Sequence, residues 1–96
     1  MMYTIYVTFT CHPGKREAYV QKLHEGGYLD AIRNEEGCKR YDFYFSEKDK
    51  NTLLLIEMWE SKSDQEQHMT TPHMAEVMKL NGDYIVSAKL GEFTLC

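Results

Sequence analysis

The side chains best suited to chemistry lie close together in the sequence, between Glu57 and His73. Trp59, the only tryptophan of the chain, follows two residues after Glu57, so both side chains project from one face of an extended strand. A ligand could stack on the indole beside the carboxylate, since small-molecule pockets combine aromatic walls with a few polar groups. The alternative is a core tryptophan beside an edge carboxylate that pairs with a lysine.

Two histidines follow this pair. His68 lies in a short polar segment with helical character, where it could exchange a proton near neutral pH or act as a surface or capping residue. His73 comes directly after a proline that starts a helix, and it could support a ligand or form only a local hydrogen bond. The two histidines are separated by a helix break and have no evident third ligand, so no metal site is expected.

Length, charge and cysteine content restrict the class of protein. The 96 residues predict one domain, residues 1–96, and a chain this small gains from burial through association. With 11 basic and 15 acidic residues the net charge is -4, which predicts neither nucleic acid nor an anionic membrane as a partner. The sequence shows no transmembrane run and no signal peptide pattern. Its 3 cysteines lack a CxxC spacing, which favours reduced thiols in a cytoplasmic protein.

The first half of the chain predicts a strand, a helix and a second strand. Apolar and polar residues alternate over residues 2–11, which is the pattern of a strand. A helical pattern begins at Lys15 and is interrupted at Gly26 and Gly27, where we expect a kink or a close contact, before it resumes over Tyr28 to Arg33. Residues 38–47 predict the second strand.

The second half repeats this order of strand, helix and strand. Residues 52–60 predict a third strand, whose Leu53 to Ile56 run is apolar on both faces. A capping box at Ser63 predicts one short helix, and Thr71 followed by proline predicts another that ends at Asn81 and Gly82. A last strand is expected from Asp83 to Phe93.

This order, β-α-β-β-α-β, predicts an α+β fold, the ferredoxin-like sandwich. The predicted helices cover one face of the sheet, yet Leu53 to Ile56 require cover on both faces. The simplest cover is the same sheet of a second copy, so we expect a homodimer.

Several short segments resemble one family. They are the turn Pro13-Gly14-Lys15, the segment Glu35 to Cys38, the segment Ile56 to Ser61, and the segment His68 to Met74. With the element order, they make the chain similar to the antibiotic biosynthesis monooxygenase-like domains, especially small bacterial quinol monooxygenase-type members. The resemblance implies a dimeric α/β barrel of two ferredoxin-like subunits packed sheet to sheet.

The resemblance also implies a reaction and a site. Some members oxidise a small quinol or other dihydroxyaromatic with O2 and need no cofactor. Carried over by position, Trp59 becomes the stacking wall and His68 the base, and these two are the predicted catalytic residues. Glu57 and His73 become supporting polar groups of the substrate site. Tyr6 and Tyr41 could line the same pocket or a dimer interface, and they complete the predicted substrate-binding set.

The reaction type stays open at this stage. Several oxygenase members and the haem-degrading branch use an asparagine in the first strand, whereas residues 2–11 contain threonines and no asparagine. Other relatives process small phosphorylated sugars without oxidation. The alternatives are therefore a non-oxidative, isomerase-like enzyme for a small polar metabolite, and a ligand-binding dimer without turnover.

Overall fold

A computed structural model describes residues 2–92 of the chain. The elements alternate in the predicted order: β1 (Tyr3–Cys11), α1 (Arg16–Glu25), α2 (Tyr28–Arg33), β2 (Cys38–Phe45), β3 (Thr52–Trp59), α3 (Lys62–His68), α4 (Pro72–Tyr84) and β4 (Ile85–Glu92). Each of the two predicted helical regions therefore contains a pair of helices. The break between α1 and α2 lies at Gly26 and Gly27, as predicted, and Gly27 adopts a left-handed conformation with φ 74°.

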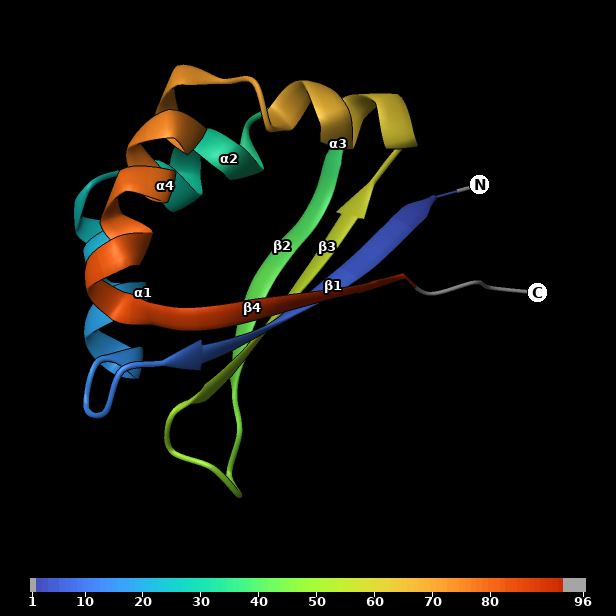
Figure 1. The fold of residues 1–96 in the computed structure, drawn as a ribbon. Coiled ribbons are helices and arrows are strands. Elements are labelled where there is room, and N and C mark those ends of the chain that lie inside the picture. Colours follow the sequence, from blue (N-terminus) through green and yellow to red (C-terminus); the bar gives the residue numbers. More distant parts are fainter. Residues whose placement is uncertain (1, 93–96) are drawn as a thin grey trace.

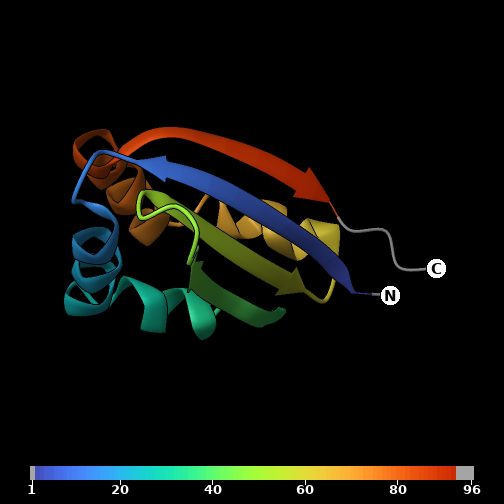
Figure 2. The same ribbon diagram turned by 90° about the horizontal axis from the view of Figure 1, so that it is seen from below.

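The strands form one antiparallel sheet in the order β2-β3-β1-β4, with β1 and β3 in its centre (Figures 1 and 2). This is the ferredoxin-like α+β fold that the sequence predicts. The register pairs Glu57 of β3 with Ile5 of β1 and with Tyr41 of β2. Because side chains alternate between the faces of a sheet, these three residues lie side by side on one face.

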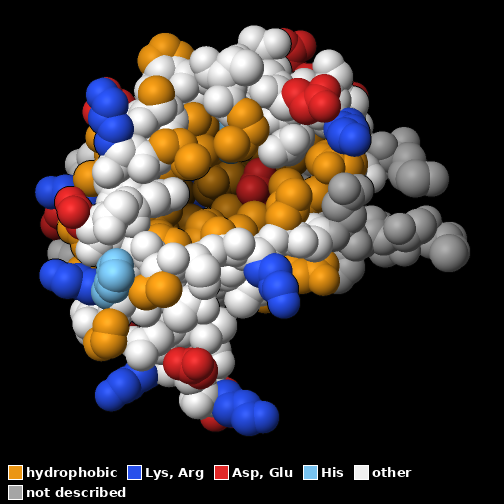
Figure 3. All heavy atoms as spheres, viewed as in Figure 1, with side chains coloured by type: hydrophobic (Ala, Val, Ile, Leu, Met, Phe, Trp, Pro, Cys, Tyr) orange, Lys and Arg blue, Asp and Glu red, His pale blue; other side chains and the backbone are white. Residues whose placement is uncertain are grey.

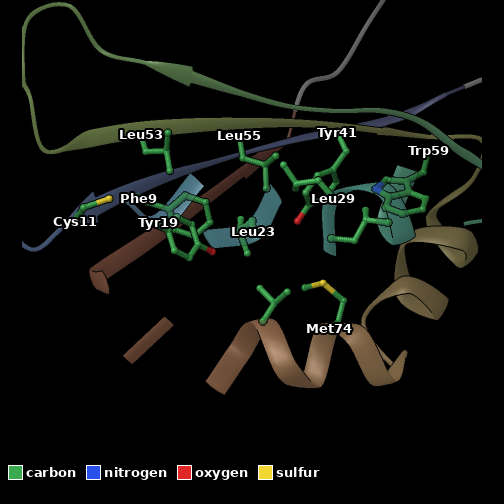
Figure 4. Packing of buried hydrophobic residues seen from close by; sticks show 12 residues of the cluster. Phe9, Cys11, Tyr19, Leu23, Leu29, Tyr41, Leu53, Leu55, Trp59 and Met74 are labelled. Atoms are coloured by element: carbon green, nitrogen blue, oxygen red, sulfur yellow. The ribbon is translucent and has the colours of Figure 1, made fainter. Parts of the chain in front are cut away.

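That face carries the hydrophobic core. Along β3 buried and half-buried residues alternate, with Leu53, Leu55, Glu57 and Trp59 buried. Figure 4 shows side chains of the sheet, among them Leu55, pointing toward Met74 of α4. The face is thus buried by the helices, and each fully buried large apolar side chain contributes about 1.5–3 kcal/mol.

The opposite face is covered less. Leu54, Ile56 and Met58 point to this side and are half-buried, while Tyr44 is exposed. The described residues place no helix on it, because the core side chains of the helices all belong to the cluster on the other face. None of the described helices is long and apolar enough to cross a membrane.

Two predicted helix boundaries are wrong. The cap of α3 is Ser61, whose Oγ accepts a hydrogen bond from the Asp64 amide at 3.1 Å, and not Ser63, which lies inside the helix. The helix α4 also continues past Asn81 and Gly82 to Tyr84. Gly82 is an exposed helical residue with open space around its Cα, so the helix carries it at a cost of about 1 kcal/mol. Phe93, the last residue of the predicted final strand, lies outside the described residues.

Candidate active site

A cavity of about 260 Å³ lies between the sheet and the helices α3 and α4. Its walls are mainly apolar, with Ile5, Val7 and Leu55 on the side of the sheet and Met74 and Val77 on the side of α4. Figure 3 shows this hollow as a hydrophobic depression with an acidic side chain at its base. A cavity of roughly 150 Å³ is sufficient for benzene, so this one can hold a single or fused aromatic ring.

Several polar side chains also face the cavity: Tyr19, Tyr41, Glu57, Gln65, His68 and Asn81. Tyr19 and Asn81 satisfy each other, because the Tyr19 hydroxyl donates to Asn81 Oδ1 at 2.8 Å. Glu57 and His68 are the groups of the cavity suited to proton transfer. Both lie next to Trp59, at the end of β3.

His68 is 1% exposed, and its two ring nitrogens have different surroundings. Nδ1 lies 2.8 Å from Glu35 Oε2, whereas Nε2 is buried and has no hydrogen-bond partner among the described residues. An ionised carboxylate only accepts hydrogen bonds, so Nδ1 carries the proton and Nε2 presents a lone pair. Burial lowers the pKa of His68, which keeps the ring neutral at physiological pH.

His73 shares the same carboxylate oxygen. Its Nε2 lies 2.6 Å from Glu35 Oε2, so this oxygen accepts from two imidazoles. The side chains of Glu35 and His73 are 12% and 24% exposed, respectively, so the network extends from His68 toward the surface. His73 supports the site through Glu35 and does not line the cavity.

The turn between α2 and β2 holds Glu35 at this point. Gly37 has φ 81°, a conformation that favours glycine, and a Cβ at this position would clash with the Asp64 carboxylate of α3. The Glu60 amide at the end of β3 donates to the Gly37 carbonyl at 2.8 Å. The glycine thus lets the turn approach α3, which brings Glu35 within reach of His68.

Thr71 fixes the two histidines relative to each other. Its hydroxyl donates to the His68 carbonyl at 2.9 Å, at the end of α3, and accepts from the Met74 amide at 3.3 Å, at the start of α4. One side chain therefore closes the first helix and caps the second, as Thr71 followed by Pro72 predicts. This explains how residues on either side of a helix break can bind one carboxylate.

Trp59 lies on the same side of the sheet as His68, with ring centroids 4.7 Å apart. It is 0% exposed and is not part of the cavity lining, so it contacts the back of the His68 ring and not the space for a ligand. Its Nε1 donates to Glu57 Oε1 at 3.1 Å. The position of Trp59 therefore does not fit a stacking wall, and its contacts are with His68 and Glu57.

Glu57 is a buried carboxyl group in a central strand, not an edge carboxylate paired with a lysine. Burial raises its pKa to about 7, the hydrogen bond from Trp59 opposes this shift, and the charge of Glu35 adds to it. Near neutral pH a protonated and an ionised form of Glu57 therefore coexist at the base of the cavity.

The two tyrosines of the predicted substrate site separate. Tyr41 is 5% exposed, lines the cavity, and its ring lies edge-on to His68 with a centroid distance of 5.6 Å. Burial raises the pKa of Tyr41 well above its ordinary value, so the phenol stays protonated. Tyr6 is on the opposite face of the sheet, where it lies over Gly91 of β4, so it does not line this cavity and its place agrees with the alternative of a dimer interface.

Glu35 is the residue of this site that sequence reasoning missed. It belongs to a segment that carries the family resemblance, but nothing in its spacing relates it to His68, 33 residues later. Gln65 of α3 also lines the cavity. Glu35 also gives the two histidines a third potential metal ligand. The sequence showed no such ligand, which was the reason to expect no metal site.

The sequence and fold are similar to those of known proteins. An uncharacterized protein of Synechocystis, sll1783, is 27% identical over 73 residues, which are 76% of this chain and 48% of that protein. The chain thus spans about half the length of this curated relative. The solved structure of PA3566 from Pseudomonas aeruginosa is 25% identical, has a TM-score of 0.85, and covers 99% of this chain and 94% of its own.

Another solved structure, Rv0793 from Mycobacterium tuberculosis, has a TM-score of 0.82 at 22% identity and covers 100% of this chain and 96% of its own, which supports the fold alone. The family model described as antibiotic biosynthesis monooxygenase matches residues 2–80. This match includes β1, the Glu35 turn, and all residues of the histidine network. The chain belongs to the antibiotic biosynthesis monooxygenase family.

Proposed function

We propose that the protein oxidises a small quinol or other dihydroxyaromatic with O2, with His68 as the base and without a cofactor. The observation that carries this proposal is the buried Nε2 of His68, which has no hydrogen-bond partner among the described residues, on a ring that lines an apolar cavity while Glu35 occupies Nδ1. A buried polar atom without a partner costs free energy, so a site that keeps one is suited to a ligand that supplies the missing hydrogen.

The cavity fits the substrate class. Its apolar walls and about 260 Å³ suit an aromatic ring, and Tyr41 and Glu57 can hydrogen-bond hydroxyl groups at its base. A hydroxyl near His68 would donate its proton to Nε2, because the neutral ring can accept one. A ring that fills the apolar cavity would displace water from it, and the resulting phenolate would keep the electron density that reduction of O2 requires.

The reaction balances without another reductant. A 1,4-dihydroxybenzene and O2 give a hydroxy-1,4-benzoquinone and water, with one oxygen atom entering the ring and the other leaving as water. The substrate loses four electrons and O2 gains them. His68 Nε2 takes the first phenolic proton, and returns it to the oxygen that leaves as water.

A second candidate is a non-oxidative proton transfer, such as the isomerisation of a small hydroxycarbonyl compound. It is supported by Glu57, whose pKa of about 7 places a proton donor in the cavity that also holds a base. One group would remove a proton from carbon and the other would return one to a different atom. This reaction needs no O2, which separates the two candidates.

We further propose that the protein acts as a homodimer through the open face of the sheet. Leu54, Ile56 and Met58 give this face an apolar centre, and the described helices do not cover it. The free thiols of Cys11 and Cys38 are consistent with a reducing compartment such as the cytoplasm.

The experiment is oxygen uptake with a panel of hydroquinones and naphthohydroquinones, in the wild type and in His68→Ala. We expect uptake above the rate of autoxidation, and a loss of about 10²–10⁴-fold in kcat for the variant. The matched control is His24→Ala, an exposed helical histidine that should leave the rate unchanged. Absence of enzyme-dependent uptake with every substrate would refute the oxidation, and product formation under argon would support the second candidate.

A further inference from the structure

The carboxylate of Glu35 and the two histidines form a compact cluster of donor atoms. Glu35 Oε2, His68 Nδ1 and His73 Nε2 all lie within 4.8 Å of one another, and the two nitrogens lie 2.8 and 2.6 Å from the oxygen. The three residues come from three different parts of the fold: the turn before β2, the end of α3 and the start of α4. Because these elements are already folded, binding an ion would not need to order further segments of the chain, and the three ligands are preorganised.

We propose that this cluster is a binding site for a divalent transition-metal ion, with Zn²⁺ as the best fit, that lies behind His68 and controls the chemistry of its ring. Two imidazoles and one carboxylate are a common zinc set with an open fourth position. Calcium and magnesium prefer sites built from oxygen, so the two nitrogens argue against them.

The spacing of the donor atoms is close to what such an ion requires. Ligands about 2.1 Å from a tetrahedral ion lie roughly 3.4 Å apart, so the hydrogen-bonded nitrogens and oxygen would separate by less than about 1 Å. The partly exposed side chains of His73 and Glu35 can supply this movement, while the buried His68 stays in place. The ion would enter from the surface side of the cluster, past His73, and not through the cavity.

Metal binding would change the nitrogen on the other side of the His68 ring. In the metal-free site Nδ1 donates its hydrogen to Glu35, and Nε2 is a buried acceptor without a described partner on a ring that lines the cavity. An ion on Nδ1 takes the lone pair that this nitrogen gains when its proton moves to Nε2. Nε2 then carries an N–H donor in place of a lone pair, and the His68 ring stays neutral because its proton has only moved from one nitrogen to the other.

The inference about binding is independent of the proposed function, whereas its effect on turnover rests on it. In the metal-loaded protein His68 cannot accept a substrate proton, so the ion acts as an inhibitor of a base-dependent reaction. A ligand that accepts a hydrogen bond would instead gain a partner in the cavity. The site thus couples the surface to the cavity through one imidazole ring.

The test is isothermal titration of the full chain with Zn²⁺ under reducing conditions. We expect one ion per chain, with affinity reduced by roughly tenfold or more in His73→Ala and in Glu35→Gln. His73 is the most exposed of the three ligands, so its variant is the one least prone to misfold. Circular dichroism verifies the fold of each variant.

Two controls exclude other ligands. His24→Ala removes an exposed histidine, and Cys38→Ser removes the thiol in the strand that follows the Glu35 turn. Both should bind Zn²⁺ as the wild type does. Absorption spectra with Co²⁺ should show nitrogen and oxygen ligation without a thiolate band.

The proposal is overturned if no binding is detected, if His73→Ala binds as tightly as the wild type, or if Cys38→Ser abolishes binding. The effect on the ring has its own readout: nitrogen NMR of His68 should show a proton on Nδ1 in the metal-free protein and on Nε2 after Zn²⁺ is added. A protein that binds Zn²⁺ in this way but oxidises no quinol would refute the proposed function and leave the metal site standing.

Discussion

His68 Nδ1 lies 2.8 Å from Glu35 Oε2, across 33 residues of sequence, and this contact determines which nitrogen of the ring carries the proton. The other nitrogen, Nε2, is the buried polar atom without a partner that marks the site. A carboxylate that orients an imidazole in this way acts through the tautomer and need not contact a substrate. Glu35 is therefore a positioning residue in the proposed reaction.

The first prediction concerns this contact. Glu35→Gln should lower kcat by roughly tenfold or more, because the amide can also donate to Nδ1 and stabilise the wrong tautomer of His68. Nitrogen NMR should show a proton on Nδ1 in the wild type and a mixture of tautomers in the variant. Glu36→Gln, at the exposed neighbouring position, is the matched control and should change neither measurement. A single unchanged tautomer in Glu35→Gln would contradict this role.

The second prediction follows from the raised pKa of Glu57. Its pKa is about 7 in the folded protein and 4.5 ordinarily, so the folded state binds more protons than the unfolded state between these values. The free energy of unfolding should therefore fall as the pH rises from 4.5 to about 7 and then level off. Between pH 5 and pH 8 the wild type should lose roughly 2–3 kcal/mol of its free energy of unfolding through this group, and Glu57→Gln should abolish that loss.

Urea denaturation at pH 5 and pH 8 measures this effect. The matched control is Glu60→Gln, which changes an exposed carboxylate just beyond the same strand and should keep the pH dependence of the wild type. A wild-type protein that is more stable at pH 8 than at pH 5, with a difference that Glu57→Gln abolishes, would show the opposite sign and refute the buried, protonated carboxyl.

The third prediction separates the two contacts of Trp59. Trp59→Phe keeps an aromatic ring beside His68 but removes the N–H that donates to Glu57 at 3.1 Å. The pKa of Glu57 should rise further, because this hydrogen bond favours its ionised form. The loss of stability should be about 1–3 kcal/mol, from the lost hydrogen bond and the smaller ring.

Carbon NMR of the Glu57 carboxyl group as a function of pH measures the shift. Tyr19→Phe is a suitable control, since it removes a buried hydroxyl that bonds Asn81 and leaves the contact between Trp59 and Glu57 intact. A lower pKa of Glu57 in Trp59→Phe would show that the indole does not stabilise the carboxylate.

Much of the fold could be predicted from the sequence, because periodicity reports which side of an element is buried. The alternation in β1 and the apolar run in β3 predict the strands, and the spacing of two residues predicts correctly that Glu57 and Trp59 share a face. Boundaries were harder: Ser61 and Ser63 both precede helical residues, and only the backbone conformation selects Ser61 as the cap. Helix α4 likewise passes Gly82, because one glycine costs less than the packing of the last turn contributes.

The site was less predictable, because its contacts join residues that are distant in sequence. The chemistry of an imidazole marks His68 as a candidate, but the polar sequence of α3 does not predict that this side chain is buried. No nearby residue pattern marks Glu35 as part of the site. Its position depends on the close approach of the turn at Gly37 to α3, which is a tertiary contact. Tyr6 was assigned to the pocket by residue type, although its position in β1, one residue after Ile5, places it on the other face.

The last prediction concerns the open face of the sheet. Ile56 lies at its centre, between Tyr6 of β1 and Asp42 of β2 in the register, and is half-buried in the single chain. Ile56→Lys should convert a dimer to a monomer, because burial of a lysine charge in an interface costs several kcal/mol and the neighbouring Asp42 already pairs with Arg40. Sedimentation velocity at micromolar concentration measures the change.

The matched control is Ala75→Lys, an exposed position of α4 on the helical side, which should leave the dimer intact. A wild type that sediments as a monomer, or an Ile56→Lys variant that remains a dimer, would exclude this face as the interface. A dimer that survives in both variants would have to use another surface.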